Sequence, residues 1–306
     1  MGKKKNLGWQ AQRMITSKFT PGIKRHDEKR RVKEEFFKEH GRMPSATEII
    51  VPNILSYGTK DTYVKEVKAY ARWVEKIHPV KFMDQAKGYV AEYLQSLQAR
   101  GLAVDSLRTA RSAIAKMYSI PSREFGFKMP KHYPDQATKG RKVLEKDEWM
   151  ERLHGDKIHV MESIGLRRHE AVPIRVEQIT ADYKHIEGII GKGGRVRYIN
   201  VLNPELLKKY VESKSLKEGD KLFNRVEKGI NVHRTRRSYA ETMYLKLLED
   251  KYEKGEKTSE YYLKRDGSGR KYDKEMLRIV SQNLGHNRER VVVESYLSFN
   301  AGFACK

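Results

Sequence analysis

The sequence is almost without cysteine, since Cys305 is the only one. A single cysteine cannot form an internal disulfide or a cysteine-rich zinc cluster, which excludes the disulfide-stapled secreted class. The ten histidines do not occur at the tight spacings of metal ligands. We therefore expect no metal, no cofactor and a reducing compartment.

Long apolar runs are also missing. No stretch approaches the roughly 20 apolar residues that a membrane-spanning helix needs. The start, MGKKKNLGWQ, lacks the apolar segment of a secretory signal. We expect no export and no membrane insertion, and thus a cytoplasmic protein.

Positive charge is abundant instead. The chain has 63 Lys and Arg against 40 Asp and Glu, a formal net charge of +23. So large an excess indicates a polyanionic partner. With 38% hydrophobic residues over 306 positions, the chain can still bury the core of one large or two moderate domains.

The first half of the chain is basic and helical in pattern. Residues 1–45 combine clustered bases with one helix-like stretch, and we expect a basic N-terminal extension that is either a solvated surface helix or a phosphate-contacting arm. Residues 46–128 carry helical apolar periods at 59–77, 83–100 and 105–118, which predict a helical DNA-binding domain. Residues 129–143 have prolines and bases without a period and are expected to form a linker.

The helix at 105–118 supplies three candidate DNA contacts. Arg108, Arg111 and Lys116 lie away from its apolar face. An ordinary basic surface helix would show the same pattern, so this assignment is open.

The second half, 144–306, mixes helices with a short sheet. Glycines at 191, 193 and 194 precede the alternating segment 195–199, which predicts a small antiparallel sheet. Further helices are expected at 146–153, 158–164, 204–212, 232–248, 273–283 and 288–297. A polar stretch at 249–272 is expected to be a surface insertion, and a short tail follows residue 297. The predicted fold class is therefore mainly α with a small antiparallel β-sheet.

Four separated fragments carry the chemistry of this second half. They are Gly165-Leu166-Arg167-Arg168-His169-Glu170, Gly191-Lys192-Gly193, His233-Arg234-Thr235-Arg236, and Leu284-Gly285-His286 followed by Tyr296. Each is weak alone, but the ordered set resembles the tyrosine recombinase family, the phage-type integrases and their relatives. The resemblance covers about residues 144 to 297 and, more loosely, the helical half before them, which is similar to the family's core-binding domain.

Cleaving a DNA strand without a metal requires a nucleophile, a proton donor for the leaving 5′ oxygen, and fixed cations around the phosphorus. The resemblance implies that Tyr296 is the nucleophile and that Lys192 is the proton donor. Arg167 and Arg236 would then hold the two non-bridging oxygens, because a guanidinium is always charged and donates two parallel hydrogen bonds.

The remaining motif residues have supporting roles by the same resemblance. His233 lies about one helical turn before Arg236, so both can face one phosphate. His286 would bind a phosphate oxygen or assist proton movement near the nucleophile. Glu170 would hold the active-site cations in place. Arg195 and Arg197 are candidate contacts to the DNA backbone, in a positioning role.

Two features depart from the usual family pattern. The interval from Arg236 to His286 is lengthened by the polar insertion, and the step from His286 to Tyr296 is one residue longer than the commonest spacing. A helix displaced by one residue turns a side chain by about 100° unless a local irregularity absorbs it. The tail residues Leu297, Phe299 and Phe303 are expected either to dock on a neighbouring subunit, as in the family, or to pack on their own domain.

The resemblance implies a site-specific DNA recombinase that closes as a C-shaped clamp on double-stranded DNA and works through a 3′-phosphotyrosyl intermediate. It further implies a tetramer on two DNA sites, accessory DNA-bending or excision factors, and a bacterial or phage-encoded, nucleoid-associated protein. Integration or excision of a mobile element is favoured over the resolution of chromosome dimers, because the chain is less compact than such resolvers. The alternatives are relaxation of DNA by a type IB topoisomerase and a non-catalytic DNA-binding regulator on the same fold.

Overall fold

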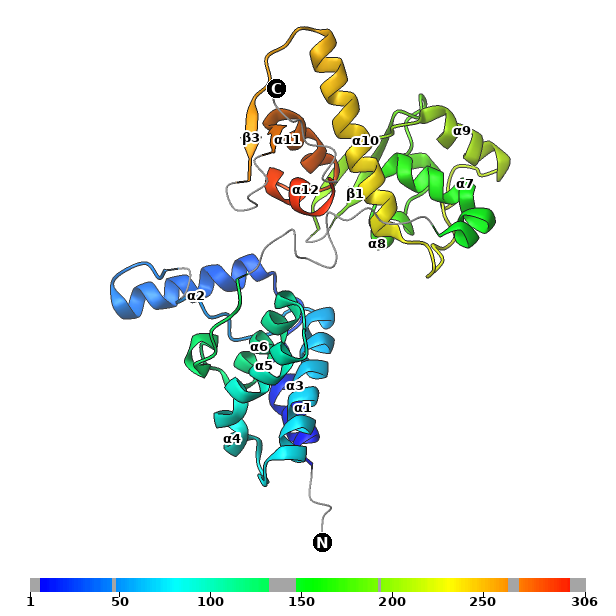
Figure 1. The fold of residues 1–306 in the computed structure, drawn as a ribbon. Helices are drawn as coiled ribbons and strands as arrows, with labels where there is room; N and C mark the ends of the chain where they lie inside the picture. The colour runs from blue at the N-terminus through cyan, green and yellow to red at the C-terminus, as the bar shows by residue number, and fades with distance from the viewer. Residues whose placement is uncertain (1–5, 46–47, 132–146, 192–193, 264–269, 298–306) are drawn as a thin grey trace. The chain divides into compact units, whose positions relative to one another are not determined.

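The computed structural model describes residues 6–45, 48–131, 147–191, 194–263 and 270–297. The chain divides into two compact units, Met1–His132 and Tyr133–Lys306, each of which is described by itself (Figure 1). The boundary falls within the segment expected to be a linker, 129–143. Helices dominate and the described strands form two antiparallel pairs, so the predicted fold class is confirmed.

The regular elements of the first unit, over its described residues, are all helices. Its helices are α1 (Leu7–Thr16), α2 (Arg25–His40), α3 (Tyr57–Ile77), α4 (Met83–Ala86), α5 (Val90–Ala99) and α6 (Val104–Tyr118), with the 3₁₀ turns η1 (Lys87–Tyr89) and η2 (Ser122–Phe125). The helices expected at 59–77 and 105–118 are therefore confirmed as α3 and α6. The one expected at 83–100 is instead broken into α4, η1 and α5.

Helix α1 does not behave as the expected basic extension. Residues 1–45 were predicted to stand apart as a basic extension, but Leu7, Ala11 and Ile15 of α1 are buried in the core of the first unit. These residues recur every four positions, so they form one apolar face that packs against α3. Clustered lysines and arginines lie near this face in the sequence, so an analysis based on charge does not detect it. Only α2 matches the solvated helix that was expected.

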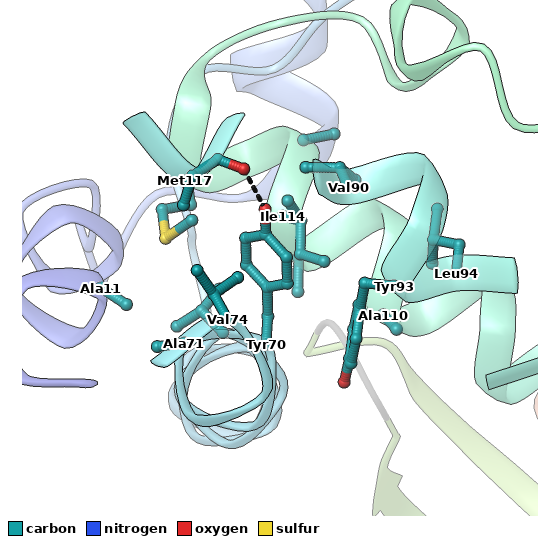
Figure 2. Close-up of a cluster of buried hydrophobic side chains, with 14 of the residues drawn as sticks. Ala11, Tyr70, Ala71, Val74, Val90, Tyr93, Leu94, Ala110, Ile114 and Met117 are labelled. Carbon is teal, nitrogen blue, oxygen red and sulfur yellow. Dashed lines mark hydrogen bonds between the residues drawn. The ribbon is translucent and has the colours of Figure 1, made fainter. Parts of the chain in front are cut away.

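The core of the first unit is built around Tyr70 of α3 (Figure 2). Val74, Ile114 and Met117 lie around its ring, and its hydroxyl donates to the Ala86 carbonyl at the end of α4. A buried phenol needs such a partner, because an unpaired polar group costs about 1–3 kcal/mol in a core. This bond also fixes where α4 ends.

The second unit has a long central helix. Its elements are α7 (Glu148–Ile164), α8 (Arg168–Ala171), η4 (Val176–Gln178), β1 (His185–Ile190), β2 (Val196–Asn200), α9 (Pro204–Ser213), α10 (Val232–Glu253), β3 (Glu260–Tyr262), β4 (Lys271–Asp273), α11 (Lys274–Asn283) and α12 (Glu289–Ser295). Helix α10 packs against α7 and α11, and α11 packs against α12 (Figure 1). The antiparallel pair β1–β2 is the predicted sheet.

Side-chain caps set the starts of the functional helices. The Asn231 side chain accepts the backbone N–H of Arg234 at 3.1 Å, which begins α10 at Val232. The Asp273 carboxylate accepts the N–H groups of Glu275 and Met276 and so begins α11.

Three elements differ from their expected form. The two helices expected at 146–153 and 158–164 form one helix, α7, with a kink at His154. Helix α10 runs on to Glu253, into the stretch expected to be an insertion, and the rest of that stretch contributes the hairpin β3–β4. Buried Lys251 ties the two parts together through ion pairs with Asp273 and Glu275.

Over the part of the chain that the structure describes, no helix combines the length and the apolar character needed to cross a bilayer.

The close packing of Gly165 in the second unit can be tested by substitution. It ends α7 in the left-handed conformation at φ +60°, and a Cβ there would lie 2.3 Å from the Tyr239 ring. Because strain and overpacking add, Gly165→Ala should lower the free energy of unfolding by about 2–4 kcal/mol. Gly255→Ala is the matched control, since Gly255 has φ +66° but open space around it. It should cost about 1 kcal/mol. Urea unfolding of both variants measures the difference, and equal losses would contradict it.

Candidate active site

Glu170 lies at the centre of a cluster formed by residues of the four sequence motifs. It is in α8, its side chain is fully buried, and it accepts the backbone N–H of Arg167 at 2.9 Å. Its carboxylate also accepts from Arg167 Nη1 at 2.6 Å and lies 3.7 Å from Arg236 Nη1. A buried carboxylate needs such compensation, because desolvation alone penalises its charge.

Arg197 of β2 makes the other close contact with this carboxylate. Its Nη1 and Nη2 donate to the two oxygens of Glu170 at 3.3 and 3.0 Å. Its Nε donates to the Asn283 carbonyl at 3.1 Å. The sequence suggested Arg197 as a contact to the DNA backbone, but the side chain is 9% exposed and bound within the protein.

Arg236 projects from the first turns of α10 and is almost fully buried. Its Nη1 donates to the Gly165 carbonyl at 2.6 Å, and its Nη2 donates to the Leu284 carbonyl. Its Nε donates to the Tyr296 hydroxyl at 3.1 Å. Arg236 therefore joins three motif fragments, those of residues 165–170, 233–236 and 284–296.

Arg167 and His286 form the more accessible edge of the cluster. Arg167 Nη2 is 3.0 Å from His286 Nε2, and the Tyr296 hydroxyl is 3.3 Å from the same nitrogen. A guanidinium only donates, so His286 Nε2 must carry the lone pair and the imidazole proton must be on Nδ1. The lone pair therefore faces both the arginine and the phenol.

Tyr296 is positioned by the end of α12. It follows the last residue of that helix with φ −126° and ψ −21°, while its N–H still donates to the Val292 carbonyl at 2.9 Å. The extra residue between His286 and Tyr296 is thus absorbed by the irregular helix end. The phenol reaches the cluster and is 6% exposed.

His233 is nearby, whereas the two rival tyrosines have other partners. The His233 ring centroid is 5.4 Å from that of Tyr296. Tyr239 donates to the Asn200 carbonyl at 2.8 Å, and Tyr244 accepts the N–H of Asp273. Burial raises the pKa of both rival phenols above the usual range. Of the three tyrosines, only Tyr296 joins the cationic cluster.

The charges of the cluster move the pKa values of its members. Burial would raise the pKa of Glu170, but hydrogen bonds from Arg197 and from the N–H of Arg167 lower it to about 2. Burial, followed by the charges of Arg236, Arg167 and Arg197, lowers the pKa of His286 to about 4. Burial and Arg236 also lower the pKa of His233. At neutral pH the carboxylate is ionised and the histidines are neutral.

Not every expected contributor belongs to the cluster of described residues. Lys192, expected to be the proton donor, lies outside the described residues, as do Phe299 and Phe303 of the tail. Arg195 is exposed and lines an open pocket of about 470 Å³ beside His286 and Arg288. This pocket leads from the surface to the side of the cluster.

The candidate DNA contacts of the first unit differ among themselves. Arg108 is ion-paired with Asp105 one turn away. Lys116 is half-buried and donates to the Val51 carbonyl, whereas Arg111 has a buried Nε without a hydrogen-bond partner among the described residues. Only Arg111 and Lys116 line the concave surface considered next.

A cationic pocket of about 710 Å³ lies in the first unit. Its charged lining is entirely basic: Arg25, Lys29, Arg111, Lys116 and Arg123. Burial and the charges of Lys18 and Arg25 lower the pKa of Lys116, and burial and Arg108 lower that of Arg111. Crowded cations in a partly dry site are destabilising by themselves, so an anion that entered would be bound favourably.

Three residues position the site through contacts that sequence reasoning did not assign to them. Arg168 donates to the carbonyls of Val226, Glu227 and Ile230 and so fixes the loop that leads into α10. The Asn283 side chain accepts from the Asn200 N–H at 2.8 Å and ties α11 to β2. Gly285, at φ +65°, turns the chain from α11 to His286. In the sequence, only the glycines and the two consecutive arginines stand out, and neither pattern shows which groups these residues contact.

The lowered pKa of His286 predicts a pH-dependent stability. Its ordinary value is 6.5 and its value in the folded chain is about 4. Between these values the unfolded chain binds more protons, so the contribution of neutral His286 falls as the pH falls from 6.5 to about 4. His286→Asn should therefore lose less stability than the wild type over this window. Urea midpoints measure it, with His169→Asn, an exposed histidine of α8, as the control. Parallel curves for wild type and His286→Asn would contradict it.

The chain has structural neighbours among DNA-recombining proteins. No protein-family model and no curated protein matches it. Among solved structures, the XerH site-specific recombinase bound to difH substrate is 16% identical, with 96% of this chain and 92% of that chain covered and a TM-score of 0.48. The Tn1549 transposon integrase in complex with circular intermediate DNA is 13% identical, with 89% and 96% covered and a TM-score of 0.44. The XerA recombinase is 14% identical, with 90% and 95% covered and a TM-score of 0.32.

Proposed function

We propose that the protein is a site-specific DNA recombinase that cuts and rejoins DNA through Tyr296. The observation that carries the proposal is the position of the Tyr296 hydroxyl, 3.1 Å from Arg236 Nε and 3.3 Å from His286 Nε2. The phenol is thus held between a fixed cation and a neutral imidazole lone pair that can accept its proton.

The proposed reaction exchanges one phosphodiester for another. The Tyr296 hydroxyl gives its proton to His286 Nε2, and its oxygen forms a bond to phosphorus. The bond from phosphorus to the 5′ oxygen breaks, and Lys192 protonates that oxygen. The products are a 3′-phosphotyrosyl link and a free 5′ hydroxyl, so the reverse step needs no external energy source.

The arginines supply the stabilisation of the transition state. Arg167 is 23% exposed at the edge of the cluster and has donors that are not engaged by Glu170 or His286. Arg236 holds the phenol and lies deeper. A fixed guanidinium stabilises the phosphorane more than the starting phosphate, because negative charge grows on the oxygens. His233 is proposed to face the same phosphate from α10.

DNA affinity is proposed to come from basic surfaces on each unit. In the first unit the cationic pocket, and in the second unit Arg195 and Arg288 beside the cluster, offer contacts to backbone phosphates. The sequence resemblance further supports a clamp of both units on duplex DNA, a tetramer on two sites with accessory factors, and a role in moving a mobile element.

The nucleophile is tested with a nicked suicide substrate that traps the covalent intermediate. Wild type should give a DNA-linked band on a denaturing gel, whereas Tyr296→Phe should give none, because the attacking oxygen is gone. Tyr198→Phe is the control, since Tyr198 is 61% exposed on β2 and makes no contact with the cluster. A linked band in Tyr296→Phe would show that another residue attacks. Supercoil relaxation without recombinant products would favour the topoisomerase alternative.

The cationic pocket is tested by the salt dependence of binding. Arg111→Gln should weaken binding to duplex DNA and reduce the slope of log Kd against log salt by about 1, because one phosphate contact is lost. Arg108→Gln, on the same helix, should change the slope less, since Arg108 is already paired with Asp105. Fluorescence anisotropy in a Tyr296→Phe background measures both. An unchanged slope for Arg111→Gln would remove the pocket from the DNA interface.

A further inference from the structure

Arg197 lies in a channel that two glycines keep open. A Cβ added to Gly191 would lie 2.8 Å from Arg197 Nη1, and one added to Gly285 would lie 2.9 Å from Arg197 Cζ. Real Cβ atoms do not approach other atoms so closely, so any larger residue at either position would displace the guanidinium. Both glycines belong to motif fragments, the one before Lys192 and the one before His286.

All three guanidinium nitrogens of Arg197 are hydrogen-bonded within the protein. Its two terminal nitrogens grip both oxygens of Glu170, and its Nε donates to the Asn283 carbonyl. The paired donors match the planar geometry of a carboxylate, which a lysine could not reproduce. Arg197 thereby links α8, β2 and the end of α11.

Two members of the candidate active site depend on this link. Glu170 also binds Arg167 at 2.6 Å, so the carboxylate's position fixes that guanidinium. Asn283 and Gly285 precede His286, whose N–H donates to the Ser281 carbonyl at 2.7 Å in the turn that ends α11. A displacement of Arg197 would therefore move both Arg167 and the histidine that faces Tyr296.

We infer that Arg197 is a positioning residue for DNA strand transfer, which acts through Glu170 and the 283–286 turn and does not contact the phosphate. The inference rests on the proposed function. A direct phosphate contact does not fit, because the side chain is 9% exposed and its three nitrogens are all bound within the protein.

The charges around His286 give the inference an independent readout. The charges of Arg236 in α10, Arg167 beside α8 and Arg197 in β2 lower the pKa of this imidazole, whereas that of Glu170 in α8 raises it. Tyr296 contributes its hydroxyl. Removing the Arg197 charge should bring the pKa of His286 back toward its ordinary value. The histidine would then lose its lone pair to a proton at a higher pH.

The experiment uses the full chain with Arg197→Lys and Arg197→Gln, and Arg195→Gln as the matched control. Arg195 is two residues away on the same hairpin and carries the same charge, but it is exposed. Duplex affinity is measured in a Tyr296→Phe background, and the single-turnover rate of adduct formation is measured on the suicide substrate across a pH series.

We expect both Arg197 variants to bind DNA as the wild type does and to form the adduct about 10²-fold more slowly, because small misplacements of reacting groups have that effect. The acid limb of the rate profile should move to higher pH in Arg197→Gln. Arg195→Gln should weaken binding without moving that limb. In a Glu170→Gln background, Arg197→Gln should add little further loss, since both act through one contact.

The failures of the two proposals are distinguishable. Adduct formation at the wild-type rate by the Arg197 variants, or weaker DNA binding with an unmoved acid limb, would overturn the positioning role alone. Retained DNA affinity shows that a slow variant is folded. A wild type that forms no Tyr296-dependent adduct on its own recombination site would overturn the proposed function and this role with it.

Discussion

The second unit depends on one buried carboxylate among several guanidinium groups. Glu170 has no solvent contact, and Arg167, Arg197 and Arg236 lie at 2.6, 3.0 and 3.7 Å from its oxygens. Without it, three cations would face one another where water screens them little, and mutual repulsion would push the segments that carry them apart. With it, α8, β2 and α10 are drawn to one point. The net charge there remains positive, which suits the proposed role of this cluster in binding a DNA phosphate.

Main-chain geometry also helps to hold the charged cluster in place. Gly165 and Gly285 are both in the left-handed conformation and both end a helix, and the carbonyls of Gly165 and Leu284 receive Arg236. The guanidinium is therefore held by peptide oxygens, which cannot change rotamer as a side chain could. Preorganisation of this kind reduces the reorganisation that a reaction would otherwise require. Arg168, next to Arg167, does similar work for the loop that leads into α10.

The sequence was sufficient for those features that leave a period or an ordered motif. Helix periods predicted α3, α6, α9 and α11 closely, and the motif order brought Arg167, Glu170, Arg236, His286 and Tyr296 to one place in the structure. It failed where a residue's role depends on a distant partner. Arg197 resembles any strand arginine until Glu170 is found beneath it, and α1 is concealed by the lysines around it. The break after Ala86 is a tertiary feature that interrupts the continuous helix expected at 83–100, whereas the kink at His154 falls between the two helices that the sequence predicted.

The position of Tyr296, directly after the seven-residue helix α12, bears on how accessible its hydroxyl is. With 6% of its surface exposed and its oxygen between Arg236 and His286, the phenol is shielded from bulk solvent while the protein is free of DNA. Nucleic acid that only touches the surface would meet Arg167, at the more accessible edge of the cluster, before it met the phenol. On the proposed function, DNA reaches the Tyr296 oxygen only when the end of this short, weakly self-supporting helix moves.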